Sequence, residues 1–193
     1  MMRANLSRLI TALRAETPPK QIWQKPFDYD PSHYQRLCNL NGKTPTNLDL
    51  CNYAHDMLYE VSPLQPDLLC YLLPICLEAW REDLLSNGNS EYGGFIEYFW
   101  AALANRKALQ VLNPREYAEV ETFMKDVLLD RIDQEDGLRF SGMGASPYIW
   151  FDSLGSFCVV FPALSSLWKV WWELTTIGQA CAAIQYLSCL LYE

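Results

Sequence analysis

The sequence contains little of what catalytic and metal-binding sites are most often built from. Among its 193 residues there are only two histidines, and neither stands in a recognisable serine or cysteine nucleophile motif. The motif Gly-x-Ser-x-Gly is absent, and the glycine-containing loop at 137–146 lacks the Lys-Ser or Lys-Thr pair of a phosphate-binding loop. We therefore expect no nucleophilic catalysis, no nucleotide site and no cofactor.

The chain also lacks the cysteine patterns of disulfide frameworks and zinc sites. Its seven cysteines are an odd number, and no two have the spacing C-x-x-C. Most lie among apolar residues, which is typical of reduced, buried thiols, whereas a zinc site needs clustered Cys and His. The N-terminus lacks the continuous apolar core of a secretory signal. Together these features predict a cytoplasmic protein.

No stretch alternates apolar and polar residues with enrichment in β-branched side chains, so the sequence predicts no β-sheet. Helix starts are clear instead, because Thr44, Ser62 and Asn113 each stand directly before a proline. Apolar residues then recur at helical spacing. The pattern predicts helices at about 45–60, 62–85, 95–107 and 114–133, the second of them kinked or split at Pro74 and ended by the Ser-Asn-Gly sequence at 86–88. The spacing places Leu48 and His55 on the inner face of the first helix and Val120, Met124 and Val127 on that of the last, where Glu116 completes a capping box with Asn113. We predict an all-α, single-domain irregular bundle of about seven or eight helices.

Charge divides this single domain into three parts. Residues 1–25 carry five of the 15 bases and one of the 23 acids, so their net charge is +4 and that of the remaining chain is −12. We expect a basic amphipathic helix at 1–16, a proline-rich arm at 17–45 that packs on the body, and an acidic helical body at 46–193. An Arg-rich, acid-poor N-terminal helix also fits an organelle transit peptide, but we favour a helix that packs on the body.

The last third of the chain has almost no charge. Between Ser153 and Tyr192 only Lys169 and Glu173 are charged. A helix that is apolar or small nearly all round is usually central, so we predict that the bundle forms around an uncharged C-terminal helix pair. The core stripe of the last helix is predicted to be Leu174, Ile177, Cys181, Ile184 and Leu191. Its length also suits a membrane span, which is the alternative.

Acidic residues gather on the predicted helix 114–133 and just after it. At helical spacing they share one side, and we call this set the acidic ridge: Glu116, Glu119, Asp126, Asp130, Asp133, Glu135 and Asp136. The acidic body argues against nucleic-acid binding through phosphates and suits a basic protein partner. Two interpretations stay open: the ridge binds a basic partner or a cation, or it is a wholly solvated helix face.

The two histidines permit one metal-site hypothesis. His33, followed downstream by the doublet His55-Asp56 and later by Asp126 or Asp130, resembles the HD metal-dependent phosphohydrolases. The resemblance implies an all-helical fold in which the doublet ligates a divalent metal. The residues after the doublet lack the glycine-containing turn common in that family. His55 also falls on the predicted apolar face of its helix, so we favour a buried structural histidine over a metal ligand.

Tryptophans form the last candidate site. Four of the seven lie near or within the uncharged third, at Trp150, Trp168, Trp171 and Trp172. Such a group can line a ligand groove or an interface, and plain core packing is the alternative.

The acidic body and the absence of a catalytic constellation favour a non-catalytic protein-binding module. Its unknown partner is expected to be basic, as when an immunity protein neutralises a toxin. The alternatives are an HD-type metal-dependent phosphohydrolase and a membrane-associated protein anchored by the C-terminal helix.

Overall fold

The computed structural model describes residues 3–20, 32–40, 45–55, 64–86, 91–105, 107–137 and 161–190. Within these ranges the regular structure is helical and contains no strand, which confirms the all-α prediction. The α-helices are α1 Leu6–Leu13, α2 Ser32–Cys38, α3 Asn47–Asn52, α4 Pro66–Leu85, α5 Gly93–Asn105, α6 Pro114–Asp133, α8 Leu167–Trp172 and α9 Ile177–Leu190. Two short 3₁₀ helices, η2 Ala108–Val111 and η3 Pro162–Ser166, lie between them.

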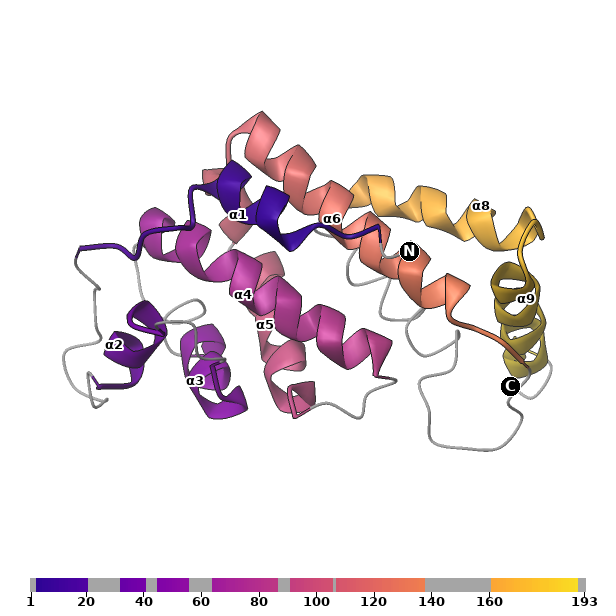
Figure 1. Ribbon diagram of the computed structural model, residues 1–193, viewed down its shortest axis with the longest axis horizontal. Coiled ribbons are helices and arrows are strands. Elements are labelled where there is room, and N and C mark those ends of the chain that lie inside the picture. The colour runs from indigo at the N-terminus through magenta and orange to yellow at the C-terminus, as the bar shows by residue number, and fades with distance from the viewer. Residues whose placement is uncertain are drawn as a thin grey trace.

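The central element is α4. Its 20 residues span roughly 30 Å, and apolar side chains on several sides of it are buried, Leu69, Leu72 and Leu77 completely. Helices α1, α5 and α6 all contact it, and Figure 1 shows it running through the middle of the molecule. A helix that is apolar nearly all round belongs at the centre of a fold, and here that helix is α4.

Helix α4 differs from its prediction at the start and in the middle. It begins at Pro66 after Gln65, which makes no side-chain capping bond, whereas the predicted capping residues Ser62 and Pro63 lie outside the described ranges. It passes through Pro74 as one element, so of the two predicted outcomes, a kink or a split, the split is wrong. Proline removes one helical hydrogen bond, and the burial of the flanking turns compensates for that loss. The helix ends at Leu85, as the Ser-Asn-Gly sequence predicted.

Helix α3 begins two residues later than predicted. Thr46, not Thr44, is the N-cap, and it forms a capping box with Asp49. Asp49 is buried, and its carboxylate also accepts a hydrogen bond from the Arg36 guanidinium at 2.8 Å, which ties α2 to α3. Burial alone would raise the pKa of Asp49, but the hydrogen bonds from Arg36 and Thr46 outweigh burial, and the pKa lies below its usual value.

The buried face of α3 also differs from the prediction. Leu48 is 59 % exposed and His55, at the end of the following turn, is exposed as well, although both were assigned to the inner face. Leu50, Tyr53 and Ala54 are buried instead. The reason is the position of α5, which packs on α3 and selects that side of the helix.

Helix α6 has the start that the sequence predicted. The Asn113 side chain accepts hydrogen bonds from the first turn, and Glu116 completes the capping box. The predicted inward residues Val120, Met124 and Val127 are fully buried. Helix α1 lies across α4 and α6, with its apolar residues Leu9 and Leu13 buried between them (Figure 1).

Part of the proline-rich arm is helical rather than irregular. The seven residues of α2 contact α3, and segments 21–31 and 41–44 of the arm lie outside the described residues. A helix this short is what the surrounding prolines permit.

Helices α8 and α9, the predicted C-terminal pair, pack against each other at one end of the molecule, where α9 also contacts α6 (Figure 1). The prediction that the bundle forms around this pair is therefore wrong. Ile177 is 74 % exposed and Ile184 46 % exposed, and Leu174 lies in the turn before α9 at a φ of 51°. No helix in the described part of the chain is long and apolar enough to cross a membrane.

The small face of α9 is the one that packs. A Cβ atom built on Gly178 would lie 2.3 Å from the Ile132 carbonyl oxygen at the end of α6, so only glycine permits this approach. Ala182 and Ala183 are buried on the same helix. The closest contact available to α9 therefore uses its small residues and leaves its large ones at the surface.

Candidate functional site

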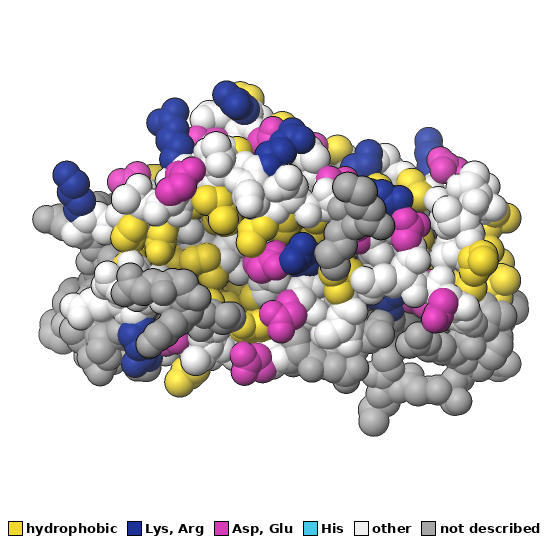
Figure 2. Space-filling view, viewed as in Figure 1, with side chains coloured by type: hydrophobic (Ala, Val, Ile, Leu, Met, Phe, Trp, Pro, Cys, Tyr) yellow, Lys and Arg dark blue, Asp and Glu magenta, His cyan; other side chains and the backbone are white. Residues whose placement is uncertain are grey.

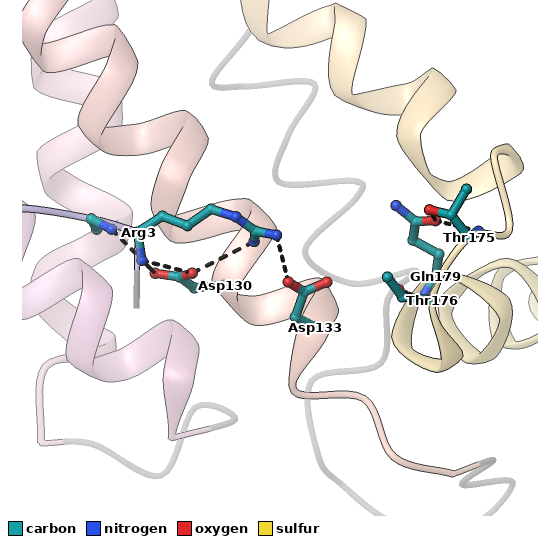
Figure 3. Close-up of polar contacts among 7 residues, drawn as sticks. Arg3, Asp130, Asp133, Thr175, Thr176 and Gln179 are labelled. Carbon is teal, nitrogen blue, oxygen red and sulfur yellow. Dashed lines mark hydrogen bonds and ion pairs between the residues drawn. The ribbon is translucent and has the colours of Figure 1, made fainter. Parts of the chain in front are cut away.

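Three residues of the acidic ridge, Glu119, Asp130 and Asp133, are bound by the N-terminal part of the same chain. Arg8 of α1 forms a two-pronged ion pair with Glu119, in which both N–O distances are 2.7 Å. Arg3 bridges the last turn of α6, with its guanidinium 2.6 Å from Asp133 and 3.6 Å from Asp130 (Figure 3). The basic N-terminal segment therefore packs directly against the acidic ridge, although the two belong to different parts of the predicted domain.

Asp130 is the centre of this contact and is only 7 % exposed. Its carboxylate accepts hydrogen bonds from the backbone N–H of Arg3 at 2.8 Å and of Ala4 at 3.3 Å. These bonds fix the chain just before α1 begins (Figure 3). Asp130 is therefore a buried residue that holds the N-terminal backbone, and its assignment to an exposed ridge was wrong.

The other ridge residues are placed differently from one another. Glu116 caps α6 by accepting from the Asn113 backbone N–H at 2.9 Å, and Glu135 is buried in an ion pair with Arg131 at 2.6 Å. Asp126 is half-buried, and burial together with the charge of Asp130 raises its pKa. Asp136 is exposed. The ridge is therefore not a single solvated face, and its role in binding a partner stays a prediction.

The residues of the metal-site hypothesis are only partly described. His55 is exposed, with its ring edge-on to Tyr98 at a centroid distance of 5.6 Å, so its predicted burial was wrong. His33 lies in α2, but its side chain and all of Asp56 lie outside the described part of the structure. Asp130 is engaged by the N-terminal backbone. Among the described residues no three His, Cys, Asp or Glu side chains are placed to hold a metal ion.

The tryptophan group is also only partly described. Trp150 and the side chains of Trp168 and Trp171 lie outside the described residues, and Trp172 is 40 % exposed at the end of α8. Two tryptophans that the sequence did not single out, Trp80 and Trp100, pack edge-to-face in the core at 5.6 Å.

A small cavity lies between α1 and α4, and we call it the α1–α4 groove. The sequence did not predict this acidic site. It has a volume of about 200 Å³. Its described lining is Leu6, Ile10, Leu40, Pro45, Pro74, Ile75, Glu78, Ala79, Glu82 and Tyr92. The Tyr92 hydroxyl donates a hydrogen bond to the Pro45 carbonyl at 3.2 Å, which holds one wall to another. On the face drawn in Figure 2, hydrophobic side chains gather over α4 and acidic side chains border them.

Glu78 and Glu82, one turn apart on α4, are the charged residues of the groove's described lining. One carboxylate oxygen of Glu78 accepts from Arg81, whereas the other, Oε2, is buried and has no hydrogen-bond partner within the described part of the chain. A buried carboxylate oxygen without a donor is costly, and native proteins rarely leave one without a reason. The sequence signal that could have found this site is the pair of acids four residues apart on a helix that is mostly apolar.

The described cysteines are free, and they are buried or half-buried, which confirms for them the prediction of reduced thiols. Burial raises the pKa of the Cys38 and Cys70 thiols to about 11 and that of Cys76 further. At neutral pH these groups are thiols rather than thiolates, and therefore poor nucleophiles.

The chain matches no protein-family model, no curated protein and no solved structure.

Proposed function

We propose that the protein is a non-catalytic protein-binding module that holds a basic segment of its partner in the α1–α4 groove. The observation that supports this proposal is Glu78, which lines the groove and whose buried Oε2 has no hydrogen-bond donor among the described residues. An arginine or lysine from a partner would supply that donor. The net charge of −8 gives the same preference at long range, since it attracts basic proteins and repels acidic ones.

The size of the groove supports a side chain as its occupant. Small-molecule sites usually measure about 300–1,000 Å³, and the groove is about 200 Å³. A space of this size suits one long side chain, with its apolar stem along Ile75 and Ala79 and its charge at Glu78. The rest of the partner would lie outside, over the surface of α1 and α4.

The molecule contains an example of the binding mode we propose. The segment that contains α1 is basic and amphipathic. Helix α1 buries Leu9 and Leu13, its Arg8 pairs with a carboxylate of α6, and Arg3, just before the helix, pairs with another. Apolar contact and charged hydrogen bonds thus act together on one helix. A partner segment of the same character fits the neighbouring groove on the other side of α1.

The proposal is tested with a fluorescent peptide of arginine and leucine at helical spacing, and with the same peptide carrying uncharged citrulline in place of arginine. We expect the arginine peptide to bind, and Glu78→Gln to weaken its binding about tenfold or more, since a charged hydrogen bond contributes about 1.5–3 kcal/mol. The binding should also weaken as salt is added. Fluorescence anisotropy measures both effects.

The matched control is Glu173→Gln, which removes the same charge from an exposed position directly after α8, away from the groove. It should leave peptide affinity within about twofold, because long-range charge contributes little at physiological salt. Equal binding of the arginine and citrulline peptides would contradict the proposal. So would an equal loss of affinity in Glu78→Gln and Glu173→Gln.

A further inference from the structure

A second and larger cavity lies where α5 ends, η2 turns and α6 begins. Its volume is about 640 Å³, within the usual range of small-molecule sites. The described lining is Leu103, Ala104, Lys107, Leu109, Gln110, Leu112, Pro114 and Tyr117. Most of these side chains are apolar, and Lys107 is the charged one. The cavity therefore has apolar walls and a cation at its edge, the reverse of the acidic α1–α4 groove.

Lys107 is held in a backbone conformation that lysine rarely adopts. Its φ is 49°, in the left-handed region, where glycine would fit without strain. The turn is fixed on both sides, because the Lys107 N–H donates to the Ala104 carbonyl at 3.2 Å and the Gln110 N–H donates to the Lys107 carbonyl at 2.9 Å. A strained residue held in this way points to a use for its side chain.

The remaining polar groups of the lining are neutral. Gln110 offers an amide, and Tyr117, whose ring packs on Phe161 at 5.0 Å, offers a hydroxyl. Burial, with a smaller effect of Glu121, raises the pKa of Tyr117, so its hydroxyl keeps its proton at neutral pH. A ligand in this cavity thus meets apolar walls, neutral hydrogen-bonding groups and one positive charge.

We propose that this cavity binds a small amphiphilic anion, a carboxylate on an apolar tail, with the tail against Leu103, Leu109 and Leu112 and the carboxylate at Lys107. The site is independent of the α1–α4 groove and of the basic partner proposed for it. The charge of Lys107 selects the anion, because it is the charged side chain of the described lining.

Isothermal titration calorimetry with decanoate, decanol and decyltrimethylammonium tests the proposal on the full chain. We expect one saturable site for decanoate and weaker binding of the uncharged and cationic analogues. Lys107→Gly should weaken decanoate about tenfold while leaving decanol unchanged. The same variant should melt at a higher temperature, because glycine relieves the left-handed strain, so a loss of binding cannot come from unfolding.

Two further variants complete the test. Lys125→Met removes a charge from exposed α6, eight residues beyond Tyr117, and should leave decanoate affinity unchanged. Ala104→Trp fills the cavity and should abolish binding of both decanoate and decanol. Unchanged decanoate affinity in Lys107→Gly or Ala104→Trp would overturn the proposal, as would absence of saturable binding or tighter binding of the cationic analogue.

Discussion

Two regions of this molecule use apolar residues in opposite ways. In the body formed by α1, α4 and α6, apolar side chains are buried and carboxylates such as Asp130 are held by hydrogen bonds. At the α8–α9 end, where charge is almost absent, Ile177 and Ile184 lie at the surface and the small residues Ala182 and Ala183 are buried. Figure 2 shows hydrophobic side chains at the surface of this end. The comparison shows that apolar composition alone does not determine whether a segment is buried. Burial depends on how closely a neighbouring helix can pack against it.

The largest expected effect comes from making the same Leu→Ala change in each of the two regions. Leu72→Ala in α4 should lower the free energy of unfolding by about 2–5 kcal/mol, because it opens a cavity in the core. Leu187→Ala, the same change at an exposed position of α9, should alter it by less than about 0.5 kcal/mol. Urea unfolding measures both. Similar losses would show that the α9 surface is covered in solution and would remove the contrast.

The contact of α1 with the body is tested at Asp130. Asp130→Ala should lower the free energy of unfolding by about 1–3 kcal/mol, since it leaves the backbone N–H groups of Arg3 and Ala4 without their acceptor. Asp133→Ala, which removes an exposed ion pair to the same arginine, should cost at most about 1 kcal/mol. Hydrogen exchange in α1 should rise only in the first variant. An equal rise in both would assign the contact to charge alone.

The attachment of α9 to the body is tested at Gly178. Gly178→Ala places a methyl group against the Ile132 carbonyl, so α9 must move, at a cost of about 1–3 kcal/mol. Gly137→Ala is the matched control, because apart from its chain neighbours no described residue has an atom within 4 Å of the added methyl group. Hydrogen exchange should rise in α9 and stay constant in α4. Unchanged exchange in α9 would show that the close contact does not hold this helix.

The smallest effects concern pH and belong to the body, where two carboxylates shift in opposite directions. The lowered pKa of Asp49 gives stability that is present above its unfolded value of about 3.9 and is lost as the pH falls through its folded pKa. The raised pKa of Asp126 gives a contribution that is present below about 3.9 and is lost as the pH rises through its folded value.

At neutral pH, Asp49→Asn should therefore destabilise the protein by about 1 kcal/mol, and Asp126→Asn should stabilise it by a few tenths. Each difference should shrink as the pH falls through the folded pKa of the carboxylate concerned, which for Asp126 lies above the usual value of about 3.9 and for Asp49 below it. Thermal unfolding across this pH range measures them. Shifts of the same sign in the two variants would contradict the assignment of the two environments.

The sequence by itself determined the helices and their local signals. The capping box at Asn113 and Glu116 and the buried face of α6 were predicted because both depend on residues within a few positions of each other. The apolar stripe of α1 was predicted for the same reason. The all-α fold class followed from the same local periodicity, because side-chain spacing and backbone hydrogen bonding repeat along a helix.

Only the tertiary structure decided which helix is central and which acids are available. The sequence favoured the uncharged C-terminal pair as the centre, but the approach of Gly178 to Ile132 turned the small face of α9 inward. The sequence also placed the acids of α6 at the surface. In the structure Asp130 is instead bound by Arg3, which lies more than a hundred residues away in the chain. Such contacts depend on the fit between distant surfaces, and no local spacing of residues encodes that fit.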